Sequence, residues 1–151
     1  MKVIVFPHSP DEFPDPYDLY LFIGGRLRKH EGNYRIRTDS HLDDNVPRGS
    51  FVFFHKKDVI VGYAVVETPP RKMINPDYDE LLRESKIYGY KYEPELYDRI
   101  IKFFPESIVA LGTEHWIPRK SVEKIVAKEN IYRDYIELPS DAITKILSCI
   151  P

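Results

Sequence analysis

The chain has 151 residues, of which 42% are hydrophobic and 13% aromatic, and its formal net charge is −2. This length suits one domain with a partly aromatic core, and so small a net charge favours no class of partner by itself. No apolar run approaches the roughly 20 residues of a membrane-spanning helix, and the apolar stretch at 3–6 is too short for a secretory signal. We therefore expect a cytoplasmic protein with no membrane partner.

Cysteine and histidine usage argues against disulfides and bound metals. Cys149 is the only cysteine, and the five histidines are scattered without the paired spacing of a metal site. We therefore expect no metal and no cofactor. The chain contains no glutamine and interleaves charges of both signs, a composition typical of a thermophile's protein.

The first 25 residues predict a strand, a loop and a turn. Residues 2–6 form a short strand that is apolar after Lys2 and rich in β-branched side chains, and Pro7 ends it. Residues 8–16 hold three prolines and form a loop. The aromatic and apolar segment 17–23 ends at Gly24-Gly25, where we expect a turn.

Basic residues concentrate in the next segment. Residues 25–38 contain five cations and one acid, and residues 34–38 alternate as a strand with Arg35 and Arg37 on one face. A guanidinium group binds phosphate oxygens through two parallel hydrogen bonds, so Arg26, Arg35 and Arg37 are candidate phosphate ligands. The alternative is a solvated strand face whose arginines pair with neighbouring aspartates.

The clearest element is a β-hairpin at residues 51–66, with a polar turn at 55–58. Both strands are apolar on both faces, which is typical of strands in the middle of a sheet or lining a filled barrel. Gly62 indicates a bulge or the close approach of another backbone, and Pro69-Pro70 is expected to end the pair.

The second half predicts helices around one short strand. Apolar residues at three- and four-residue spacing predict helices at 78–88 and 93–104, followed by a strand at 107–111. Pro118 is expected to open a third helix, and Ser140 to be the N-cap of the last one.

The segment from residue 49 to residue 66 resembles the core hairpin of PUA-like domains, particularly the EVE and ASCH groups. The matching positions are Gly49, Phe53, Phe54, Ile60, Val61, Gly62, Ala64 and Val66. The basic strand at 34–38 is similar to the cationic strand before the ASCH hairpin, and Leu19 to Phe22 take the place of the "YW" strand of EVE domains. The resemblance implies one α+β domain over residues 1–151, a small twisted β-barrel flanked by helices, with a helical insertion at about 70–104.

The resemblance also implies a module that binds RNA or a modified nucleotide in a cleft at the barrel edge. The candidate ligand-binding residues are Arg26, Arg35, Arg37, Phe54, His55, Lys56, Lys57 and Trp116. Trp116 could stack on a base or belong to the core, and residues 55–57 could contact the nucleic-acid backbone or keep the turn solvated.

Motifs for catalysis are weak. The chain has no glycine-rich phosphate loop and no nucleophile elbow, and Asp77 with Glu84 and Lys86 only loosely resembles a metal-dependent nuclease site. Three hypotheses remain: a binding module without chemistry of its own, a metal-dependent nuclease or nucleoside hydrolase on the same barrel, and a protein-interaction domain that uses acidic helices at 77–104.

Overall fold

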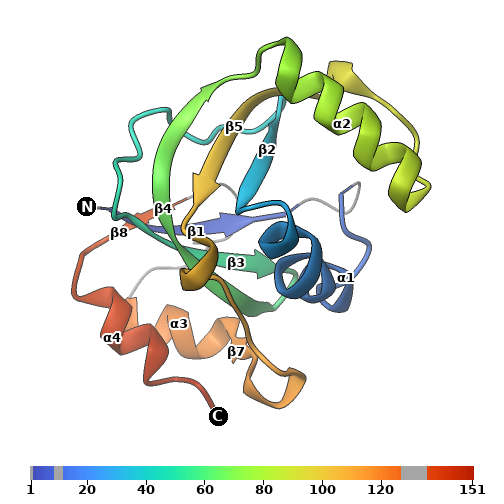
Figure 1. The fold of residues 1–151 in the computed structure, drawn as a ribbon. Coiled ribbons are helices and arrows are strands. Elements are labelled where there is room, and N and C mark those ends of the chain that lie inside the picture. The colour runs from blue at the N-terminus through green and yellow to red at the C-terminus, as the bar shows by residue number, and fades with distance from the viewer. Residues whose placement is uncertain (1, 9–11, 127–135) are drawn as a thin grey trace.

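The computed structural model describes residues 2–8, 12–126 and 136–151, and these form a mixed α+β fold (Figure 1). The strands are β1 (Val3–Pro7), β2 (Asn33–Arg37), β3 (Phe51–Lys56), β4 (Val59–Lys72), β5 (Tyr97–Phe103), β6 (Val109–Ala110), β7 (Ile117–Pro118) and β8 (Ile136–Leu138). The α-helices are α1 (Pro16–Leu21), α2 (Asn75–Tyr88), α3 (Arg119–Val126) and α4 (Ala142–Leu147). The described residues also form a π-helical segment, η1 (Phe22–Leu27), and the 3-10 turns η2 (Pro94–Leu96), η3 (Pro105–Ser107) and η4 (Thr113–His115).

The strands form one sheet in the order β2-β5-β4-β3-β1-β8, with β6 and β7 also paired to β4. Among the described residues no backbone pairing joins the edge strands β2 and β8, so the expected closed barrel is not confirmed. The sheet is instead open and strongly curved, as Figure 1 shows.

The predicted hairpin is confirmed. Strands β3 and β4 pair antiparallel from Phe51 opposite Val65 to Lys56 opposite Val59, and β1 runs parallel to β3 on its other side. Gly62 shows both expected features, since the register shifts beside it and β6 pairs directly with it. A Cβ atom at position 62 would overlap the carbonyl oxygen of Val109, so only glycine fits.

Two hydrophobic clusters cover opposite faces of this sheet. On one face Ile23 of η1 packs in the same cluster as Phe54, and on the other Ile146 of α4 packs in the same cluster as Phe53. All four of these side chains are fully buried. Successive strand residues point to opposite faces, which explains why the β3 sequence is apolar without alternation.

The segment from residue 93 to residue 104 was predicted as a helix, and that prediction is wrong. It contains the short turn η2 and then β5, a central strand between β2 and β4. Ile100 and Ile101 are both buried because each face of this strand is covered, and two adjacent apolar residues imitate part of a helical stripe. The hypothesis of two acidic interaction helices therefore loses its second helix.

Four further predictions of element type or boundary are also wrong. Residues 19–22 are helical rather than a strand, and the helix continues through Gly24-Gly25, where a turn was expected. Gly24 lies directly against Ala110 of β6, which explains why a small residue is needed at position 24. Strand β4 continues past Pro69-Pro70, where register shifts against β5 tolerate residues without an N–H. The N-cap of α4 is Asp141, one residue after Ser140.

No helix among the described residues has the length and apolar character needed to cross a membrane.

Replacing Gly62 with alanine should destabilise the fold by about 2 kcal/mol or more, because the new methyl group meets backbone that cannot move aside. Gly25→Ala is the matched control, since its Cβ would enter open space on a helix and should stabilise by about 0.5–1 kcal/mol. Urea unfolding measures both, and equal effects of the two changes would contradict the close approach of β6 to β4.

Candidate functional site

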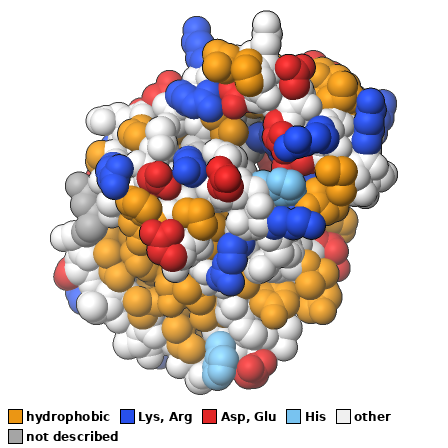
Figure 2. Space-filling view, in the orientation of Figure 1, with side chains coloured by type: hydrophobic (Ala, Val, Ile, Leu, Met, Phe, Trp, Pro, Cys, Tyr) orange, Lys and Arg blue, Asp and Glu red, His pale blue; other side chains and the backbone are white. Residues whose placement is uncertain are grey.

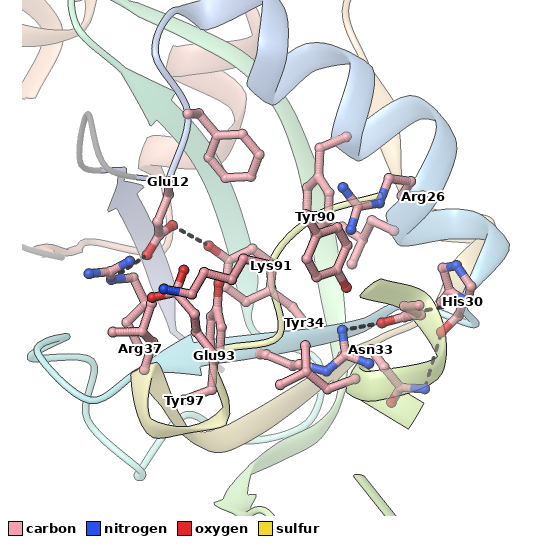
Figure 3. Close-up of a pocket in the computed structure, with 17 residues that line it drawn as sticks. Glu12, Arg26, His30, Asn33, Tyr34, Arg37, Tyr90, Lys91, Glu93 and Tyr97 are labelled. Atoms are coloured by element: carbon pink, nitrogen blue, oxygen red, sulfur yellow. Dashed lines mark hydrogen bonds and ion pairs between the residues drawn. The ribbon is translucent and has the colours of Figure 1, made fainter. Parts of the chain in front are cut away.

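A pocket of about 300 Å³ lies among η1, β2, α2 and the segment after α2 (Figure 3). This volume is at the lower end of the range for small-molecule sites, roughly 300–1,000 Å³. Its aromatic lining residues are Phe13, Phe22, Tyr34, Tyr90 and Tyr97. Its charged lining residues are Glu12, Arg26, Arg35, Arg37, Glu84, Lys91 and Glu93. Figure 2 shows acidic and basic side chains interleaved around a recess below α2.

Arg26 is held in the pocket by aromatic rings rather than by acids. Its guanidinium carbon lies 4.5 Å from the ring centroid of Tyr88, 4.9 Å from that of Tyr90 and 5.6 Å from that of Phe22. Within the described part of the chain no carboxylate pairs with it, and its buried Nε has no hydrogen-bond partner. Stacking on rings orients a guanidinium while leaving its N–H groups available.

Arg35 belongs to a buried ion cluster between β2 and α2. Its guanidinium pairs with Glu84, whose side chain is only 3% exposed. The other oxygen of Glu84 lies 3.0 Å from His30 Nδ1, and His30 Nε2 lies 2.7 Å from the hydroxyl of Tyr88. The cluster fastens α2 to the sheet and forms one wall of the pocket.

Arg37 lies at the other end of the same strand face, where it meets Glu12. The Arg37 Nε is 3.4 Å from Glu12 Oε1 and 3.2 Å from Asp39 Oδ1, and the Tyr34 hydroxyl donates to Glu12 Oε2 at 3.4 Å. Burial raises the pKa of Glu12 to about 7, although the nearby Arg37 cation opposes the shift. The alternation that placed Arg35 and Arg37 on one face is confirmed, and both arginines have acidic partners.

The structure places the remaining candidate residues away from the pocket lining. Phe54 is fully buried behind Tyr34, with ring centroids 6.3 Å apart. His55 and Lys56 are buried within β3, and burial lowers the pKa of His55 to about 3. Lys57 is exposed at the hairpin turn with φ of 54°.

Trp116 is a packing residue in this structure. Its indole Nε1 donates to the carbonyl oxygen of Leu111 at 2.9 Å, and its ring lies 6.2 Å from that of Tyr20. It packs against both hydrophobic clusters and does not line the pocket.

Several pocket residues escaped sequence analysis. Glu12 and Phe13 lie in a proline-rich loop, and Tyr97 lies in a segment that was predicted as a helix. Tyr90 did give a signal, because the tyrosines at 88, 90 and 92 alternate and could stack on a base, although packing over the helices is the more usual role of such residues.

One group of side chains has the composition of a metal site. The possible ligand atoms of His30, Glu80 and Glu84 lie within 4.8 Å of one another. Both carboxylates already pair with arginines, Glu80 with Arg83 at 2.5 Å and Glu84 with Arg35. A divalent cation would have to compete with these two fixed cations, so the group fits an ion-pair cluster better than a metal site.

The Arg35–Glu84 pair should be structural. Arg35→Ala should cost about 3–5 kcal/mol of unfolding free energy, because it leaves a buried carboxylate without its cation. Removing both charges with Arg35→Met and Glu84→Met should cost less than the single change.

Arg83→Ala is the matched control for this pair, because Arg83 also pairs with a glutamate of α2 but is 69% exposed. We expect it to change stability by less than about 1 kcal/mol. Urea unfolding of the variants checks this, and equal losses for Arg35→Ala and Arg83→Ala would contradict the structural assignment.

Comparisons of the sequence with protein-family models and with curated proteins find no match. Comparisons of the fold with solved structures do find matches. An ASCH protein from Zymomonas mobilis aligns with a TM-score of 0.60 at 12% identity, over 99% of this chain and 96% of that one. A point mutant of the same protein gives 0.59 at 12% identity over the whole of both chains.

A YTH domain also shares the fold. The domain from the MRB1 protein of Zygosaccharomyces rouxii, in complex with N6-methyladenosine RNA, aligns with a TM-score of 0.51 at 14% identity. The alignment covers 99% of this chain and 83% of that domain. At such low identities the likeness concerns the fold alone. The chain therefore shares the fold of the ASCH protein and of the YTH domain, in agreement with the ASCH-like fold that the resemblance of its hairpin predicted.

Proposed function

We propose that the chain is a binding module for RNA or for a modified nucleobase, with a base in the aromatic pocket and a phosphate on Arg26. The observation that carries the proposal is Arg26 itself. It is a cation oriented by rings at the wall of a pocket, and no acid neutralises it among the described residues. An anion beside an aromatic group is the ligand that complements this arrangement.

Arg26 suits phosphate binding better than Arg35 or Arg37. Arg35 is committed to the buried carboxylate of Glu84, and Arg37 to Glu12 and Asp39. A phosphate that drew either arginine away would leave a buried or half-buried acid unpaired. These two arginines instead shape the pocket wall.

The rings around the pocket supply the other half of the proposed site. Stacking of a base on an aromatic side chain contributes about 1–3 kcal/mol per base in proteins that bind single strands. Tyr90, Tyr97 and Phe13 are partly exposed and line the cavity. The YTH domain with the same fold is one that binds N6-methyladenosine RNA, which supports a ligand of this kind.

Changing Arg26 to alanine should weaken binding of a short single-stranded RNA by roughly 10- to 100-fold at low salt, since a charged hydrogen-bonded contact is lost. The slope of log affinity against log salt should become shallower by about 0.7, the contribution of one phosphate contact on a single strand. Fluorescence anisotropy over a salt series measures both quantities.

Arg48→Ala is the matched control. Arg48 also lies over an aromatic ring, 4.9 Å from the centroid of Phe104, but it does not line the pocket. We expect this variant to bind as the unchanged protein does. Equal losses from the two variants would contradict a specific role of Arg26, and no binding of RNA or free modified nucleosides at low salt would refute the proposed function.

A further inference from the structure

Glu12 is an acidic group of the pocket to which the proposed phosphate contact gives no role. Figure 3 shows Glu12 and Arg26 on opposite sides of the pocket, with tyrosine rings between them. The side chain of Glu12 is 16% exposed, and its neighbours include Tyr34 and Arg37 of the pocket wall. A ligand that reached Arg26 with its phosphate could therefore place its base against Glu12.

The carboxylate of Glu12 has unused hydrogen-bonding capacity. Among the described residues each of its oxygens makes one long contact, Oε1 with Arg37 Nε at 3.4 Å and Oε2 with the Tyr34 hydroxyl at 3.4 Å. Both distances exceed those of strong charged hydrogen bonds, and an ionised carboxylate can accept about four. Two oxygens held side by side can thus accept from two neighbouring N–H groups of a ligand.

We propose that Glu12 selects a guanine base, by accepting hydrogen bonds from the N1–H and the N2 amino group of its Watson–Crick edge. This inference rests on the proposed function and names the base that the pocket takes. Guanine offers two adjacent donors on that edge. Adenine and cytosine offer a donor beside a ring nitrogen that is an acceptor, so one carboxylate oxygen would face a lone pair. A site that accepts from two donors discriminates against adenine and cytosine, because one buried carboxylate oxygen would stay without a hydrogen bond.

Protonation of Glu12 should change this preference. Among the described residues, the charged and titratable groups that act on it are Tyr34 and Arg37 of β2, Asp39 just beyond that strand, Lys56 of β3 and Tyr97 of β5. Lys91 and Glu93, from the segment after α2, line the same pocket. Arg37 and Lys56 favour the ionised form, whereas burial and Asp39 oppose it, which leaves the pKa near 7. The protonated acid presents one donor and one acceptor, the pattern that complements adenine or cytosine. Affinity for guanine should therefore rise as the pH increases through about 7 and then level off.

Isothermal titration calorimetry with GMP, IMP, AMP and CMP tests the proposal at about pH 6 and about pH 8. At the higher pH we expect GMP to bind at least about tenfold more tightly than AMP or CMP. IMP should fall between them, since it keeps N1–H but lacks the N2 amino group. At the lower pH the preference for GMP should shrink. These measurements use the unchanged protein, so the test does not depend on any variant folding.

Glu12→Gln adds a direct test, because the amide resembles the protonated acid in shape and hydrogen bonding. This variant should lose the preference for GMP and its dependence on pH. Glu67→Gln is the matched control, since Glu67 is also half-buried and pairs with a cation, Lys102 at 3.4 Å, but lies outside the pocket. It should keep the full preference for GMP.

The outcomes separate this inference from the proposed function. Equal binding of all four nucleotides, with each weakened by Arg26→Ala, would overturn guanine selection and leave the nucleotide-binding function intact. A preference for GMP that persists in Glu12→Gln would also overturn it. Binding of none of the four at low salt would overturn guanine selection and count against the proposed function as well.

Discussion

The arrangement of this protein depends on one long strand. Strand β4 pairs with β3 over its first half and with β5 over its second half, and the register shifts within the second half let the sheet turn. Among the described strands β2 pairs with β5 alone, so the position of the basic strand relative to the central hairpin follows from the bend in β4. Pro69-Pro70 lies in the region of these shifts, where a missing N–H costs no ladder hydrogen bond.

Three arginines of similar sequence context acquire different properties from their partners. Arg35 faces α2 and is neutralised by a buried glutamate, Arg37 faces the loop after β1 and shares two acids, and Arg26 is enclosed by rings. A charge in an enclosed site must be compensated by its surroundings, and acids and aromatic rings do this with different consequences. Only compensation by aromatic rings leaves the cation able to bind an anion.

The pocket lining contains three glutamates as well as four lysine and arginine side chains, and this mixture of charges matters for its chemistry. Glu12 lies in an enclosed and largely aromatic environment, so its ionisation is costly and its pKa rises to about 7. A carboxyl group in that condition can change its hydrogen-bonding pattern within the physiological range. Nearby His8 shows the complementary effect, because burial lowers its pKa to about 4 and keeps its ring neutral.

The sequence by itself determined the elements whose patterns are local. Apolar runs and a polar turn predicted the hairpin at 51–66, alternation predicted the shared face of Arg35 and Arg37, and Gly62 predicted a close backbone. Tertiary structure decided what covers each element. A strand buried on both faces looks helical in sequence, as β5 did, and a lone tryptophan does not reveal whether it packs or binds. The pocket joins residues from a loop, a π-helical segment, a strand and the chain after α2. Contacts between such distant segments depend on tertiary packing, which the local periodicity of a sequence does not predict.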